Sequence, residues 1–451
     1  MIPILTPEEM AAVDAAAPEP VEVLIDRAGA AVAHHAIQLL GGAYGRRVVM
    51  LAGKGNNGAD GRAAAKRLRR RGVRVEEIDA KAAPTRLPAA DLVIDAAYGT
   101  GFRGEHVAPD PGATPVLAVD IPSGIDGRTG EEHGRAFRAV RTVTFAALKP
   151  GLVLEPGRSC AGEVRVADIG LDVSSAAAAV VEATDVRGWL PDREATAHKW
   201  TASVLAVAGS ASMAGAGHLV AAAAQRAGAG MVRLASPGLA EDPARPTEAV
   251  GLDLPVAGWS EAVLGAADRA HALVIGPGLG TSATTQSAIL DVLAATSLPA
   301  VVDGDGLTAL GADATRILHA RNGPLVVTPH DGEFERLAGA RPTADRLAAA
   351  RSLARRLGAV ALLKGPTTVV AAPDGEVRVI VDGDARLATA GTGDVLSGVI
   401  GALLARGLTP LDAAAAGAFL HARAGRAGHS EGLVASDLVD ALPDVIEGLH
   451  A

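Results

Sequence analysis

The residues best suited to chemistry lie in the run 388–398, which reads ATAGTGDVLSG. Gly391, Thr392 and Gly393 precede Asp394, and apolar residues then recur at helical spacing, which predicts a glycine-rich turn followed by an amphipathic helix. Unpaired N–H groups and the positive dipole end at a helix start together form a site for phosphate. A carboxylate beside bound phosphate is repelled by it, so a carboxylate at this position is expected to have a function. Asp394 is therefore a candidate general base. The alternative is an acid that merely complements the helix dipole, since short glycine motifs also arise by chance.

Polar, glycine-containing loops also follow three aliphatic strands expected in the first half of the chain. The strands are expected at residues 46–52, 91–96 and 115–119, and the loops read GKGNNGADG (53–61), DAAYGTGFRGE (95–105) and DIPSGID (120–126). Ligands gather at the carboxyl ends of strands in open α/β sheets, so the three loops should converge on one pocket. Asparagine and aspartate oxygens in the first loop suit a hydroxylated ligand or a hard cation. A turn that uses Asn and Gly for their positive φ, with Asp95 and Asp120 as caps or surface acids, is the alternative.

The second half repeats the pattern of strand, polar loop and helix. Strands are expected at residues 203–208, 231–235, 272–275, 299–302, 324–327 and 360–363. His330 and Lys364 each follow a strand, so a lysine ammonium could reach phosphate oxygens, although a capping histidine and a surface lysine are the simpler interpretations. Asp303 and Asp305 could hold magnesium through water or could cap turns.

Composition narrows the class of protein. A chain of 451 residues predicts two or three domains, and 49% hydrophobic residues with only 2% aromatic ones predict cores of close-packed helices against aliphatic strands. A net charge of −9 offers no electrostatic footprint for nucleic acid. One cysteine, Cys160, excludes an intramolecular disulfide and fits a reducing compartment. Without a leader pattern or a long apolar run, we expect a cytoplasmic protein with no membrane partner.

These elements predict an α/β fold with two doubly wound domains, at residues 1–190 and 195–451. In the first domain, a short helix is expected to open at residues 6–9, and further helices are expected near residues 20–40 and 62–71. The run 172–190 shows no lasting pattern and is expected to be a connecting segment, with the boundary near residues 187–196.

The first-half motifs GKGNNGADG, DxxxGTG and VDIPSGID resemble, in this order, the YjeF N-terminal domain of the NAD(P)H-hydrate epimerase family. The resemblance implies a Rossmann-like domain that interconverts the two C6 epimers of hydrated reduced nicotinamide cofactors and binds a potassium ion. It implies potassium ligands at Asn57, Asp95 and Ser123, with Asp120 as the acid/base group and Lys149 as a second catalytic residue. It also implies a set of substrate-contacting residues: Asn56, Asn57, Gly58, Ala59, Asp60, Gly99, Thr100, Gly101, Phe102, Arg103, Gly104, Glu105 and Asp120.

The second-half motifs GPGLG, VDxDGL, TPHxGEF, KGxxT and AGTGDVLSGxI are similar to the ribokinase-like, ADP-dependent NAD(P)H-hydrate dehydratase family. This resemblance implies that Gly278, His330 and Asp394 contact the hydrated nicotinamide. It implies that ADP, with magnesium, is held by two segments: Lys364, Gly365, Pro366, Thr367 and Thr368, and the run from Asp384 to Gly391, Thr392 and Gly393. The sequence departs from the family pattern at Gly304, where alanine is common, and at Thr308, where asparagine is common.

Both halves therefore predict one bifunctional repair enzyme that epimerises NADH and NADPH hydrates and dehydrates the S form at the expense of ADP. We expect a homo-oligomer. An alternative is a vitamin-precursor kinase in the second half, since that fold shares the G-T-G-D signature, joined to a ligand-binding module without chemistry in the first half.

Overall fold

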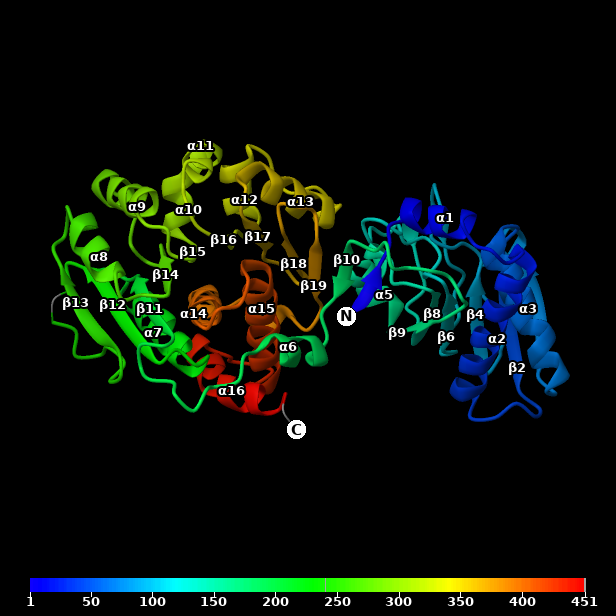
Figure 1. The fold of residues 1–451 in the computed structure, drawn as a ribbon. Helices are drawn as coiled ribbons and strands as arrows, with labels where there is room; N and C mark the ends of the chain where they lie inside the picture. Colours follow the sequence, from blue (N-terminus) through cyan, green and yellow to red (C-terminus); the bar gives the residue numbers. More distant parts are fainter. Residues whose placement is uncertain (240, 450–451) are drawn as a thin grey trace. The chain divides into compact units, whose positions relative to one another are not determined.

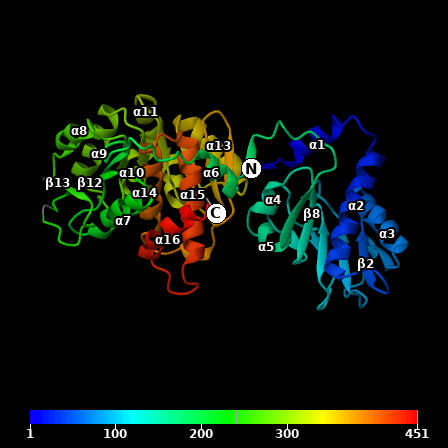
Figure 2. The same cartoon turned by 60° about the horizontal axis from the view of Figure 1, so that its bottom comes forward.

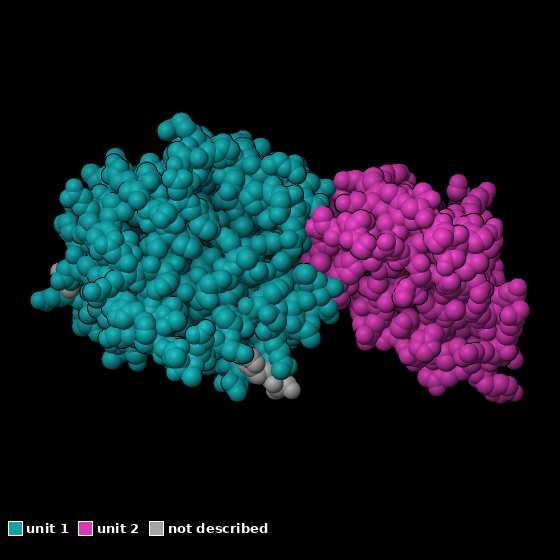
Figure 3. Space-filling model, viewed as in Figure 1, with its two compact units in different colours: residues 1, 180–451 teal, residues 2–179 magenta. Residues whose placement is uncertain are grey.

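The computed structural model describes residues 1–239 and 241–449 and divides into two compact units, residues 2–179 and residues 180–451 with Met1 (Figure 3). The division falls earlier than the predicted boundary, and the run 172–190 is not the irregular segment that was predicted. It contains β10 (Ala178–Val180) and α6 (Ala183–Trp189). The Glu182 amide donates to Asp185 at 2.9 Å to cap α6, and Val186 is fully buried. Both elements are too short to show a period in the sequence.

Residues 2–179 form a Rossmann-like unit around a six-stranded parallel sheet in the order β3-β2-β4-β6-β8-β9. Its strands are β2 (Arg47–Ala52), β3 (Arg74–Asp79), β4 (Leu92–Ala96), β6 (Val116–Val119), β8 (Arg141–Phe145) and β9 (Glu163–Ala167), and the unit also contains β1 (Ile2–Ile4), β5 (His106–Val107) and β7 (Gly134–Arg135). After β3 the chain crosses to the other side of β2, so the strand order reverses between β2 and β4. A ligand is expected beyond the carboxyl ends of these two strands.

Helices α2 (Val21–Leu40) and α3 (Asn56–Arg70) lie side by side on one face of this sheet (Figures 1 and 2). The helix expected from residue 62 begins at Asn56, so most of GKGNNGADG is helix and not loop. A Cβ atom on Gly58 would lie 1.9 Å from the Gly53 carbonyl oxygen, and one on Gly61 would lie 2.5 Å from Ala96 Cβ. These glycines therefore serve close packing within a helix. The shorter helices of the unit are α1 (Pro7–Ala15), α4 (Pro150–Val153) and α5 (Gly157–Ala161), with the 3-10 turn η1 (Ala80–Ala82).

The second unit is built on a larger sheet, in which its strands follow the order β19-β18-β17-β16-β15-β14-β11-β12-β13. The bounds are β11 (Ser203–Val207), β12 (Met231–Pro237), β13 (Val250–Leu254), β14 (Ala272–Ile275), β15 (Ala300–Val302), β16 (Leu325–Val327), β17 (Val360–Leu363), β18 (Thr368–Ala371) and β19 (Val377–Ile380). The six strands predicted from sequence are present and parallel, whereas β13 and the antiparallel pair β18 and β19 were not predicted. The doubly wound α/β class is confirmed.

Two layers of helices cover this sheet (Figures 1 and 2). One layer holds α7 (Ala214–Arg226), α14 (Thr392–Ala405), α15 (Pro410–Ala427) and α16 (Ala435–Glu447). The other layer holds α8 (Ser260–Ala267), α9 (Ala283–Ala295), α10 (Asp305–Leu310), α11 (Ala314–His319), α12 (Asp331–Ala338) and α13 (Arg346–Leu357). The 3-10 turns η2 (Gly311–Asp313) and η3 (Ala385–Leu387) lie elsewhere in the unit. The prediction that α14 is amphipathic is wrong: residues 395–405 are all buried. Helices α7 and α15 and the sheet pack around it, which a hydrophobic stripe alone does not reveal.

No helix within residues 1–239 and 241–449 combines the length and the apolar character that crossing a membrane requires.

Candidate functional sites

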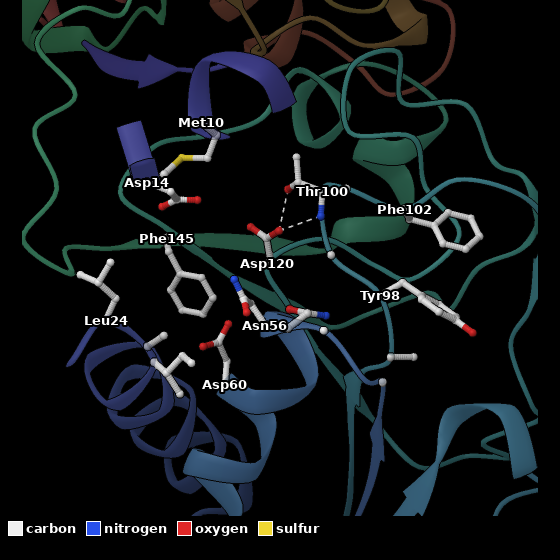
Figure 4. A pocket seen from close by; sticks show the side chains of 18 of the residues that line it. Met10, Asp14, Leu24, Asn56, Asp60, Tyr98, Thr100, Phe102, Asp120 and Phe145 are labelled. Carbon is white, nitrogen blue, oxygen red and sulfur yellow. Dashed lines mark hydrogen bonds between the residues drawn. The ribbon is translucent and has the colours of Figure 1, made fainter. Parts of the chain in front are cut away.

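A pocket of about 650 Å³ lies in residues 2–179 at the carboxyl ends of β2 and β4, where the strand order reverses (Figure 4). Nine of the predicted site residues line it: Asn56, Asn57, Asp60, Gly99, Thr100, Gly101, Phe102, Asp120 and Lys149. Seven others do not line it: Gly58, Ala59, Asp95, Arg103, Gly104, Glu105 and Ser123. The predicted convergence of three strand-end segments is therefore seen in the geometry.

Asp120 occupies the centre of the pocket wall with an unusual backbone, at φ 67°. Its Oδ2 accepts hydrogen bonds from the Thr100 amide at 2.9 Å and the Thr100 hydroxyl at 2.5 Å. Its Oδ1 lies 2.9 Å from Lys149 Nζ. Burial opposes ionisation, but the Lys149 ammonium and the Thr100 hydrogen bonds outweigh it and hold the pKa of the Asp120 carboxyl below its usual range. Asp120 is thus an ionised carboxylate held in a strained position, a feature that clusters at functional sites.

Lys149 is only 1% exposed, and its ammonium is surrounded by oxygen atoms. Besides Asp120, Nζ donates to the Thr144 hydroxyl at 2.8 Å and to the carbonyl oxygens of Phe145 at 3.0 Å and Ala147 at 3.2 Å. A buried ammonium in this setting fixes the charge and direction of its partner carboxylate.

Two more carboxylates, from Asp60 and Asp14, turn toward the same space as Asp120 (Figure 4). Burial, with the charges of Asp120 and Asp14, raises the pKa of Asp60 to about 8. Asp60 therefore carries a proton at neutral pH while Asp120 does not, and such a split marks an acid and a base. Burial also raises the pKa of Asp14. Sequence reasoning missed Asp14, because α1 lies before all six strands of the parallel sheet and follows the carboxyl end of none of them.

The predicted potassium ligands Asn57, Asp95 and Ser123 carry the oxygen atoms that a hard cation requires. Asp95 and Ser123 are fully buried, and the Ser123 hydroxyl and amide donate to the two Asp95 oxygens at 2.6 and 2.8 Å. Neither amide atom of the Asn57 side chain has a hydrogen-bond partner, although both are buried. A Cβ atom on Gly99 would lie 3.3 Å from Asn57 Cγ and 2.9 Å from Asp120 Oδ2, so the chain needs glycine where it passes between them. Buried polar groups are rarely left unpaired, so the Asn57 amide indicates a ligand at this point.

The second candidate site is at the start of α14, in the other unit. Gly391 occupies the N-cap with φ 90° and offers no side-chain cap, so the first N–H groups of the helix lack intrahelical partners. A Cβ atom on Gly393 would lie 3.7 Å from both Asp303 Oδ2 and Lys364 Nζ. The glycine turn thus brings a helix start, with its affinity for anions, against the half-buried ammonium of Lys364.

Asp303 and Asp305 hold this turn and its neighbours in place. Lys364 Nζ lies 2.8 Å from Asp303 Oδ1 and 3.6 Å from Glu333 Oε2, and the Ser397 hydroxyl donates to Asp303 Oδ2 at 2.8 Å. Asp305 accepts from the Gly280 amide at 2.7 Å. Of the two roles considered for these acids, the geometry favours ion pairing and turn capping over a magnesium site. Within residues 1–239 and 241–449 no group of three acidic, histidine or cysteine side chains is arranged for a metal ion.

Asp394 lies in the first turn of α14, as predicted. Burial and the negative charges of Asp303 and Asp305 raise its pKa to about 6, while Lys364 acts in the opposite direction. A carboxylate with such a pKa is ionised at neutral pH yet basic enough to accept a proton from a hydroxyl group held beside it.

His330 caps α12, which was the simpler of the two predicted interpretations. Its Nδ1 accepts from the Gly332 and Glu333 amides at 3.0 and 3.4 Å, and Glu333 accepts from the His330 amide at 2.8 Å. Because the His330 side chain is 57% exposed, its ring can still contact a ligand. Gly278, at φ 63°, has no room for a side chain, since a Cβ atom would lie 2.6 Å from Ala216 Cβ.

The residues predicted to hold the nucleotide lie in two segments of this unit. In the segment 364–368, Lys364 donates its amide to the Pro329 carbonyl, and Thr368 opens β18. In the segment 384–393, Asp384 pairs with Arg386 at 2.6 Å, so its carboxylate is already engaged.

Of the two departures from the family pattern, the one at Gly304 has a local explanation. The backbone of Gly304 has φ 55° and ψ −120°, a conformation that residues other than glycine rarely adopt. The Thr308 hydroxyl accepts from Arg336 at 3.4 Å.

Fold and sites together define a two-unit α/β enzyme with a Rossmann-like unit followed by a ribokinase-like one. A family model described as YjeF-related protein N-terminus matches residues 21–84 and 75–151, and one described as NAD(P)H-hydrate dehydratase matches residues 204–446. The bifunctional NAD(P)H-hydrate repair enzyme of Moorella thermoacetica is 37% identical, over 90% of this chain and 88% of that protein. The Mycobacterium tuberculosis enzyme with the same description is 44% identical, over 83% and 82%.

Solved structures of similar fold match the second unit. An ADP/ATP-dependent NAD(P)H-hydrate dehydratase from Bacillus subtilis, co-crystallised with ATP/Mg²⁺, is 32% identical with a TM-score of 0.51, over 60% of this chain and 98% of that one. A ribokinase-like protein from Enterococcus faecalis, 24% identical, has a TM-score of 0.53 over 60% and 96%. The chain therefore belongs to the family of bifunctional NAD(P)H-hydrate repair enzymes, as its motifs predicted.

Proposed function

We propose that this chain repairs damaged reduced nicotinamide cofactors by two reactions in separate sites. Residues 2–179 interconvert the R and S hydrates of NADH or NADPH, and residues 180–451 dehydrate the S hydrate at the expense of ADP. The observation that carries the proposal is that each unit holds a carboxyl group in the first turns of a helix that opens at its site. Asp60 of α3 lines the pocket with Asp120, and Asp394 of α14 follows the glycine turn beside Asp303 and Lys364. Burial raises the pKa of Asp60 to about 8 and that of Asp394 to about 6, which supports these roles.

Epimerisation requires that the C6 hydroxyl leave one face of the ring and that water or hydroxide return to the other. Protonated Asp60 can donate a proton to the departing oxygen, and ionised Asp120 can accept one from the water that returns. Lys149 keeps Asp120 charged and fixes its direction, so its role is electrostatic. Asn57, Asp95 and Ser123 would hold a potassium ion, which would supply a fixed positive charge beside the Gly99 turn.

Dehydration is difficult because hydroxide is a poor leaving group. Transfer of the terminal phosphoryl group of ADP to the C6 oxygen breaks the bond to the nucleotide and makes a leaving group of phosphate. Asp394 accepts the hydroxyl proton, and the N–H groups at Gly391 and Gly393 stabilise charge on the transferred group, while the Thr392 N–H donates to the Thr389 carbonyl oxygen at 3.4 Å. The ring nitrogen then expels phosphate, and loss of a proton from the adjacent carbon restores the reduced cofactor.

The remaining groups of the second site would bind the two substrates. Lys364 offers its ammonium to the nucleotide oxygens, with Gly365, Pro366, Thr367 and Thr368 beside it. Magnesium would arrive with the nucleotide, as in the Bacillus subtilis relative co-crystallised with ATP/Mg²⁺. His330 and Gly278 would contact the hydrated ring. We expect a cytoplasmic homo-oligomer without nucleic-acid or membrane partners, and light scattering on the purified chain tests the assembly.

Supplying mixed hydrate epimers with ADP, with ATP or with no nucleotide tests the whole proposal. Absorbance of the reduced nicotinamide should return for all of the material with ADP and for none of it without nucleotide. Recovery of the S fraction alone would refute epimerisation, and a phosphorylated product that accumulates would indicate a small-molecule kinase. Replacing potassium by tetramethylammonium should slow recovery of the R fraction only, and an unchanged rate would refute the potassium site.

A further inference from the structure

His421 is a buried histidine for which the two reactions above leave no role. It lies on α15 and is 7% exposed, and its Nε2 is 2.8 Å from the Thr392 carbonyl oxygen. Because a carbonyl oxygen only accepts, Nε2 carries the hydrogen and donates it. Burial lowers the pKa of His421 to about 4, so the ring is neutral at neutral pH.

Helix α15 is built to bring this side chain against the glycine turn. Gly417, His421 and Gly425 are four residues apart and share one face of the helix. A Cβ atom on Gly417 would lie 2.6 Å from Ile400 of α14, and one on Gly425 would lie 2.5 Å from Leu387 of η3. The two glycines therefore allow α15 to approach both sides of the turn, and His421 reaches into it between them.

The atom that His421 holds, the Thr392 carbonyl oxygen, belongs to the peptide unit that joins Thr392 to Gly393, one residue before Asp394. The Thr392 carbonyl and the Gly393 N–H are parts of one planar trans peptide, so they point in opposite directions. Anchoring the carbonyl oxygen therefore fixes the direction of the Gly393 N–H. The Thr392 hydroxyl anchors the same residue, because it lies 2.8 Å from the Leu387 carbonyl oxygen and 2.9 Å from that of Thr389 and its one hydrogen is shared between them. The Gly393 side of the turn faces Asp303 and Lys364.

We propose that His421 is a positioning residue for dehydration: its Nε2–H orients the Thr392–Gly393 peptide so that the Gly393 N–H faces the transferred phosphoryl group. This inference rests on the proposed dehydration. Donors aimed in advance at developing charge act on the transition state more than on the bound substrate. The hydrogen bond should therefore influence kcat more than the KM for ADP.

Three variants of the full chain test the proposal. His421→Leu keeps an apolar side chain of similar reach but removes the donor. His421→Gln restores a donor, because the glutamine Nε2 can take the place of the imidazole Nε2. Phe419→Leu, a buried change on the same helix, is the control for a general loss of packing. For each variant, kcat and KM for ADP, thermal unfolding and the rate of epimerisation are measured.

We expect His421→Leu to lower the kcat of dehydration about tenfold to a hundredfold, somewhat less than outright removal of an oxyanion donor. The KM for ADP and epimerisation should change little, and His421→Gln should recover most of the loss. The proposal is overturned if His421→Leu keeps the wild-type kcat, if Gln fails to rescue, or if Phe419→Leu lowers kcat as much. Absence of dehydration by the wild-type chain would instead refute the proposed function itself.

Discussion

The two candidate sites solve the problem of buried charge in different ways. In residues 2–179, Asp14, Asp60, Asp120 and Lys149 line one cavity, and the Lys149 ammonium donates to Thr144, Phe145 and Ala147. In residues 180–451, Lys364 forms ion pairs with both Asp303 and Glu333, and the backbone N–H groups at the start of α14 lie beside them. The first site therefore acts through side-chain protons and the second through fixed dipoles. Side-chain titration should govern epimerisation strongly, whereas dehydration should depend on one carboxylate and on backbone geometry.

Asp120→Asn should have the largest effect, because the residue serves both chemistry and stability. Loss of the base should slow epimerisation by a factor of about 10² to 10⁴. Lys149 would also keep a buried charge without its partner, which should cost about 3–5 kcal/mol of unfolding free energy. Urea unfolding and assays of both reactions measure these effects, with Asp126→Asn on the same loop as control. Undiminished epimerisation would remove Asp120 from its assigned role.

Asp394→Asn should stop the other reaction with little change in stability, because Asp394 has no buried counterion that depends on it alone. Dehydration should slow by a factor of about 10² to 10⁴, while epimerisation continues at the wild-type rate. Separate assays of the two activities on one preparation provide an internal control. Parallel loss of both activities would show that the two sites are not independent.

The two reactions should lose activity at opposite ends of the pH range. Asp60 must keep its proton to act as the acid, so kcat/KM for epimerisation should fall about tenfold per pH unit above about 8. Asp394 must lose its proton to act as the base, so kcat/KM for dehydration should fall in the same proportion below about 6. Profiles of kcat/KM for each reaction alone measure this. If kcat/KM for the two reactions fell over the same pH range, the assignment of Asp60 as acid and Asp394 as base would be contradicted.

Ser397→Ala should have the smallest effect on activity and stability, and it would sharpen the contrast between the two sites. It removes the hydrogen bond to Asp303 Oδ2, inside a site whose charges remain paired through Lys364. The loss should be about 1–2 kcal/mol of unfolding free energy, with a kcat close to wild type. Thermal unfolding and a dehydration assay measure both. A large fall in kcat would mean that the serine contacts the reacting groups.

The strands and the strand-end residues could be predicted from the sequence, because buried parallel strands are short aliphatic runs and ligand-binding loops follow them. Asp120 was found in this way, whereas Asp394 was found from the glycine-rich turn that begins a helix. Asp14 and His421 could not be, because each lies within a helix and meets its site only through tertiary packing. The buried character of α14 was missed for a related reason: the alanine-rich helices that cover it carry little hydrophobic contrast.

That enclosed helix also decides how the nucleotide turn can come apart. The turn begins a helix whose residues 395–405 are all buried, so it cannot fray without disturbing the core of residues 180–451. Amide hydrogens along α14 should accordingly exchange with solvent only when that whole unit opens, and at the same free energy as its central strands. Heat or denaturant would then remove ADP affinity in one cooperative step, with no partly open form that still folds but no longer binds.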